Sequence, residues 1–95
     1  MTMDDFVKAC ASASPPKGLE EPLLALYWDA RGEWEKAHAV AQGIQGPVGS
    51  LVHAYLHRKE GDQSNARYWY GRAGRPVPGG ALEEEWKAIA AELCA

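Results

Sequence analysis

The stretch HAYLHRKEGDQSNARYWYGRAGRP, residues 53–76, decides the fold that the sequence predicts. A segment without period-two alternation lies on each side of Gly61-Asp62, and each is long enough for several turns of helix. A glycine can adopt the left-handed conformation that ends a helix, and an aspartate can cap the next one. Residues from about 50 to 73 therefore predict a helical hairpin, with Ser50 as the N-cap of its first helix.

A similar unit precedes this hairpin in the chain. Sliding the sequence over itself by 29 residues superposes Ala25 on Ala54, Gly32 on Gly61 and Ala37 on Ala66. A small alanine lets two helices approach closely, and a glycine permits the tight turn between them. The sequence therefore predicts two tandem helical hairpins, the first spanning about 20–42.

Shorter helices are expected at both ends of the chain. Residues from Thr2 to about Ala11 predict an N-terminal helix, which the segment SASPPKG ends. Residues of about 81–94 predict an amphipathic C-terminal helix. The expected fold class is all-α, one domain over residues 1–95, with these two helices capping the hairpins.

The two units resemble tetratricopeptide repeats, in the form found in small uncharacterised bacterial proteins. The residues that carry the resemblance lie within 20–76: Leu24, Ala25, Trp28, Gly32 and Ala37 in the first unit, and Gly61, Asp62, Ala66, Tyr70, Ala73 and Pro76 in the second. The resemblance implies that the first helices of both units line a groove for a peptide or a partner helix.

A small, non-catalytic interaction module is the function that this resemblance favours. Its groove would be lined by Trp28, His53 and His57, with Arg31 and Arg58 at the rim. On the last helix of the second hairpin, Tyr68 and Arg72 are expected to face outward as further contacts, whereas Trp69 is expected inside. Two repeats are fewer than the roughly three such arrays need, so self-association is a further expectation.

The two histidines of the opening stretch stand where the repeat pattern favours apolar bulk. At i and i+4, His53 and His57 share one helix face, a spacing that can chelate a divalent metal with Glu60, His38 or Cys94 as a further ligand. The alternative function is therefore a metal or small-molecule site centred on them. We favour two hydrogen-bonded core histidines, and expect no cofactor.

Other function classes find little support in the sequence. No nucleophile elbow or phosphate-binding glycine loop is present, Asp29, Glu33 and Glu35 are expected to be solvated, and an enzyme is not expected. A net charge of −3 disfavours nucleic acid as a partner. An acidic start without a long apolar run predicts a cytoplasmic protein without a membrane span. Cys10 and Cys94 fit no CxxC or zinc spacing and are expected to be small residues on helix faces.

The expected core is rich in tryptophan. Trp34, Trp69 and Trp86 fall on the apolar faces of three different predicted helices. We therefore expect all three indoles to be mostly buried.

Overall fold

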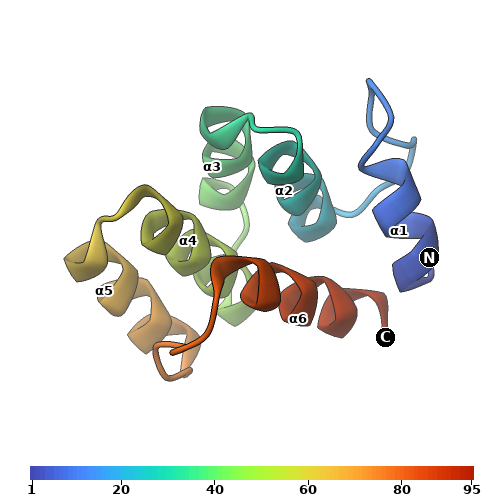
Figure 1. Ribbon diagram of the computed structural model, residues 1–95. Coiled ribbons are helices and arrows are strands. Elements are labelled where there is room, and N and C mark those ends of the chain that lie inside the picture. The colour runs from blue at the N-terminus through green and yellow to red at the C-terminus, as the bar shows by residue number, and fades with distance from the viewer.

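The computed structural model describes all 95 residues and contains six helices and no strand, which confirms the all-α class (Figure 1). The helices are α1 (Met3–Ala9), α2 (Glu21–Ala30), α3 (Trp34–Gln42), α4 (Pro47–Glu60), α5 (Gln63–Ala73) and α6 (Leu82–Cys94). None of them combines the length and the hydropathy needed to cross a bilayer.

Consecutive helices form the closest pairs, and the C-terminal helix joins them. Helix α2 packs on α3, and α4 packs on α5, while α3 and α4 connect the two pairs. Helix α6 lies across both α2 and α4 and also meets α1 (Figure 1). The indole Nε1 of Trp86 in α6 donates to the Leu26 carbonyl at 3.2 Å, and its ring stacks on Phe6 of α1 at 5.6 Å. Helix α6 therefore covers a face shared by α2 and α4.

The turns of both helical pairs form as predicted. Gly32 and Gly61 adopt positive φ values of 78° and 90°, in the region that favours glycine. The Asp62 carboxylate accepts a hydrogen bond from the Asn65 amide at 3.2 Å and so caps α5. These features fix where α2 and α4 end and where α5 begins.

Gly61→Ala is expected to lower the free energy of unfolding by about 1 kcal/mol, because alanine is strained at positive φ. No atom lies within 4 Å of the added Cβ, so backbone strain is the whole effect. Urea denaturation of both proteins measures the difference. A Gly61→Ala protein as stable as the parent would contradict the left-handed turn.

The start of α4 differs from the prediction. The helix begins at Pro47, before the expected start, and Ser50 is a buried residue inside it instead of its N-cap. Proline suits the first helical turn, where its missing N–H group is not needed. Gly49 then allows the Ile44 backbone to approach this first turn closely. Helix α4 is therefore four residues longer at its N-terminus than predicted.

The core is built mainly from tyrosine and aliphatic side chains. Its largest fully buried members are Tyr27, Tyr70, Phe6, Leu26, Leu56 and Val52. Trp34, Trp69 and Trp86 pack against this core with most of their surface buried, as expected. Trp34 and Trp86 lie at the edge of the core, where their indole N–H groups donate to main-chain carbonyls. Tyr68 is 54% exposed, which confirms its outward orientation.

Two buried carboxylates connect the helices. Asp29 of α2, expected to be solvated, is only 3% exposed and accepts from the Tyr55 hydroxyl at 2.8 Å and the Lys59 ammonium at 2.9 Å. Glu85 of α6 accepts from the Tyr70 hydroxyl at 2.6 Å and from Arg58 at 2.8 Å. Burial, with the adjacent carboxylate, raises the pKa of each tyrosine, so both phenols stay protonated donors.

Candidate metal centre

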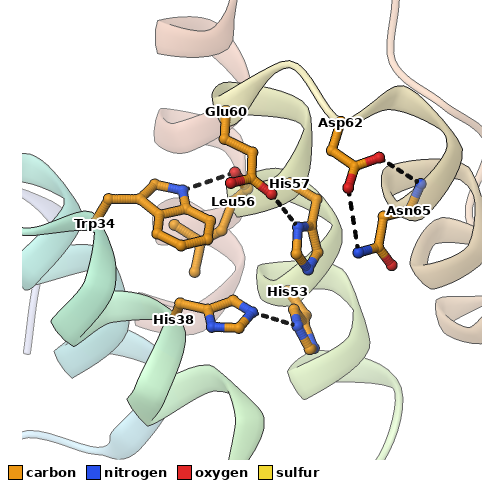
Figure 2. A network of polar contacts seen from close by, with 8 residues as sticks. All are labelled: Trp34, His38, His53, Leu56, His57, Glu60, Asp62 and Asn65. Carbon is orange, nitrogen blue, oxygen red and sulfur yellow. Dashed lines mark hydrogen bonds and ion pairs between the residues drawn. The ribbon is translucent and has the colours of Figure 1, made fainter.

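Three imidazole rings converge where α3 meets α4. His38 lies on α3, and His53 and His57 lie on α4. The Nε2 atoms of His38 and His53 are 2.9 Å apart, and one nitrogen of each of the three rings lies within 4.8 Å of the others (Figure 2). The chain has three histidines, so all of them belong to this cluster.

Helical spacing and two indoles hold the rings in place. His53 and His57 are four residues apart on α4 and stack at 4.8 Å, as the i, i+4 spacing predicts. His38 stacks on Trp34, four residues earlier on α3, at 4.8 Å, and His53 stacks on Trp69 of α5 at 4.1 Å. The cluster therefore lies between two indoles and draws on three helices.

A carboxylate determines which nitrogen of His57 faces the cluster. The Nδ1 atom of His57 lies 2.7 Å from Glu60 Oε1, so in the neutral ring Nδ1–H donates to that carboxylate. Nε2 is then an acceptor, and Figure 2 shows it pointing toward His53. No hydrogen bond to Nε2 is formed, and this atom is not completely buried.

Burial favours the neutral form of two of these rings. His53 is 7% exposed, and burial together with the neighbouring His38 and His57 lowers the pKa of His53 to about 4. Burial and His57 lower the pKa of His38, and the Glu60 carboxylate offsets part of this effect. Both rings are neutral at pH 7, which is the form that binds a metal.

In the metal-free protein, stability is expected to fall as the pH drops from about 6.5 to about 4. Histidines of the unfolded chain take up protons below about 6.5, whereas His53 of the folded chain does so only near 4. The unfolded state therefore binds more protons in this range, and acid favours it. Thermal melts with a chelator across this range measure the loss, which His53→Leu should reduce. An equal loss in His53→Leu would contradict the role of His53.

The structure separates the residues predicted to line one groove. Trp28 lies under the Lys36 ammonium at 4.4 Å, and an Arg31 guanidinium nitrogen lies 3.5 Å from the Cys10 carbonyl oxygen. Arg58 donates to Glu85 and to the Gly80 carbonyl on the α6 side. His53 and His57 instead contact α3 and α5 and are buried. The groove with all five residues on one surface is therefore not formed.

Tyr68 and Arg72 form the outward pair that was expected. Arg72 lies 3.3 Å from the Tyr68 hydroxyl, and its guanidinium lies 6.0 Å from the centre of that ring and 5.7 Å from the centre of Trp69. Partner binding through these residues stays a prediction.

Of the three residues considered as further ligands, only one joins the two histidines directly. His38 does so, Glu60 contacts the outer nitrogen of His57, and Cys94 lines a cavity elsewhere with Met1 and Leu93. The sequence named His38 as one of three possible further ligands, and only the packing of α3 on α4 sets its distance to His53.

The cluster is not part of a cavity that could hold an organic ligand. Four cavities are present, of about 270 to 460 Å³, and none is lined by any of the three histidines. The space between the rings therefore suits a single ion better than a small molecule.

Comparison with protein-family models, with curated proteins and with solved structures gave no match for this chain.

Proposed function

We propose that the protein binds one divalent transition-metal ion through the Nε2 atoms of His38, His53 and His57. The observation that carries this proposal is the convergence of every histidine in the chain on one point between α3 and α4. Neutral imidazole is a preferred ligand of Zn²⁺, Cu²⁺ and Ni²⁺. Among these, Zn²⁺ is the probe chosen for the first test.

The distances between the rings are close to those of a metal site. Two nitrogens bound to a tetrahedral Zn²⁺ lie about 3.3–3.4 Å apart, given a Zn–N distance of about 2.0–2.1 Å. The Nε2 atoms of His38 and His53, 2.9 Å apart, are slightly closer than this. All three ligand nitrogens lie within 4.8 Å of one another. Small rotations of the three side chains would bring the nitrogens to equal distances from one ion.

The structural interpretation of the histidines is compatible with these contacts but leaves one atom unexplained. Each of the two predicted core histidines has a partner, His38 for His53 and the Glu60 carboxylate for His57. His57 Nε2, however, has no protein partner and points toward the other rings. A metal ion would use this lone pair together with those of His38 and His53, once the ring that donates Nε2–H in their hydrogen bond changes to the tautomer protonated at Nδ1.

The test uses the full chain without an affinity tag. Zn²⁺ at about 100 times its dissociation constant should stabilise the protein by about 2.7 kcal/mol. For a domain of this size each kcal/mol raises the Tm by about 4–8 °C, so we expect a rise of about 10–20 °C. Calorimetric titration should show one ion per chain.

Variants distinguish this site from adventitious binding. Each of His38→Ala, His53→Leu and His57→Phe should abolish the Zn²⁺-dependent rise in Tm, while Cys10→Ser combined with Cys94→Ser should leave it unchanged. The leucine and phenylalanine replacements are chosen because the repeat pattern favours apolar bulk at positions 53 and 57. Retained binding in the histidine variants, or none in the parent, would overturn the proposal.

Glu60→Gln is expected to weaken Zn²⁺ binding about 10–100-fold without abolishing it, because Glu60 orients His57 and raises its basicity. Glu35→Gln, at an exposed position on α3, is the matched control and should bind as the parent does. Competition with a chromophoric chelator measures both constants. Equal affinities for the parent and Glu60→Gln would show that Glu60 has no such role.

The tetratricopeptide-like nature of the two helical pairs is also a proposal. It is supported by the positive φ of both turn glycines and by the burial of the four superposed alanines, Ala25, Ala37, Ala54 and Ala66. A large residue at any of these alanines would separate the paired helices. Ala54→Leu should therefore destabilise the protein more than Ala30→Leu at the exposed end of α2.

A further inference from the structure

The cluster supplies three protein ligands and no fourth. The three histidines form one group of nearby donors, and a second group contains His57 with Glu60 and Asp62. In that second group Glu60 already accepts from His57 Nδ1, and Asp62 caps α5 through Asn65. The carboxylates therefore stabilise the ligands and the helix instead of adding a donor beside the three Nε2 atoms.

The two cysteines do not complete the set either. The Cys10 carbonyl lies beside Arg31 near the end of α1, and Cys94 lines a cavity with Lys17 and Leu93. Neither belongs to a group of nearby metal-ligating side chains. A tetrahedral ion held by the histidines must take its fourth ligand from outside the protein.

The indoles and the solvent determine where this ligand enters. Trp34 covers the His38 ring and Trp69 covers the His53 ring, so both of these sides are closed by packed side chains. His53 and His57 are buried, whereas His38 is partly exposed, and no cavity adjoins the cluster. Water can therefore reach the cluster at its partly exposed His38 edge, and without an adjoining cavity only a ligand of a few atoms fits there.

Charge favours an anion in this position. Three neutral imidazoles leave the full double charge on the metal, since thiolate and carboxylate ligands are absent from the set. The Glu60 carboxylate is separated from the ion by the His57 ring. An exogenous anion would reduce the remaining charge where no protein group does.

We propose that the ion bound by His38, His53 and His57 keeps one exchangeable coordination position facing solvent, which holds water and accepts a small anion. This inference rests on the proposed metal-binding function. The cluster would then be an open metal site, which binds or activates a small ligand. A closed site, in which the protein supplies every ligand, only stabilises a fold.

The test uses the full chain loaded with Co²⁺, whose visible absorption reports its ligands. We expect a one-to-one complex whose visible bands change with azide, saturably and with an isosbestic point. Cys10→Ser combined with Cys94→Ser should respond as the parent does, because neither thiol takes the open position. A Co²⁺ complex that depends on the histidines but does not respond to azide would overturn the open position alone. Failure of the chain to bind Co²⁺ and Zn²⁺ at all would overturn the proposed function itself.

Discussion

Gly49→Ala is expected to lower the free energy of unfolding by about 3 kcal/mol or more. A Cβ atom at this position would lie 2.8 Å from the Ile44 carbonyl carbon and 2.9 Å from the Ile44 Cβ, and it would meet the carbonyl oxygen still more closely. Main-chain atoms cannot rotate away as a flexible side chain can. The first turn of α4 would have to separate from the segment that joins it to α3.

Gly71→Ala is the matched control for this prediction. Gly71 lies inside α5, it is exposed, and no atom lies within 4 Å of an added Cβ. The same substitution should therefore stabilise the protein by about 0.5–1 kcal/mol through helix propensity. Urea denaturation of both variants measures the two effects. A Gly49→Ala protein as stable as Gly71→Ala would contradict the packing of Ile44 on α4.

These glycines show why helix boundaries were harder to predict than helix identity. Gly32 and Gly61 follow long helical patterns and end them, so their conformation could be inferred from position alone. The segment around Pro47 and Gly49 contains the same residue types, yet it forms the first turn of a helix. Only the contact with Ile44 distinguishes a packed helical glycine from a linker glycine.

For a similar reason, only the part of the candidate site that lies on one helix could be predicted from the sequence. His53 and His57 are four residues apart on one helix, so their proximity follows from helical geometry. His38 lies on another helix, and its approach to His53 depends on how α3 packs on α4. Asp29 was expected to be solvated because no partner for its carboxylate is close in the sequence. Its partners Tyr55 and Lys59 lie on α4, and only the packing of α2 on α4 brings them to it.

Helix α4 is covered on several sides, so His53 and His57 are buried and line no open groove. Helix α6 contacts both α2 and α4 and carries Glu85 and Trp86 against them. The histidines lie on the part of α4 that faces α3 and α5. Helix α4 therefore has one surface that α6 covers and another that carries the candidate metal centre.

Glu85→Ala is expected to lower the free energy of unfolding by about 3–5 kcal/mol, the cost of breaking a buried charged pair. Glu85 is 9% exposed and accepts from both Tyr70 and Arg58, so its loss leaves a buried hydroxyl and a partly buried guanidinium without this acceptor. Because the carboxylate comes from α6 and its donors from α5 and α4, the variant also weakens the attachment of the C-terminal helix.

Two further variants separate these contributions. Glu84→Ala removes the neighbouring, exposed carboxylate of the same helical turn and should cost under about 1 kcal/mol, the share due to the helix dipole. Tyr70→Phe in the Glu85→Ala background removes the stranded hydroxyl, so its additional cost should be well below that of Tyr70→Phe in the parent. Urea denaturation of the parent, Glu85→Ala, Tyr70→Phe and the double variant gives the coupling free energy between Tyr70 and Glu85. Strictly additive effects would show that the 2.6 Å contact between Tyr70 and Glu85 contributes nothing to holding α6 against α5.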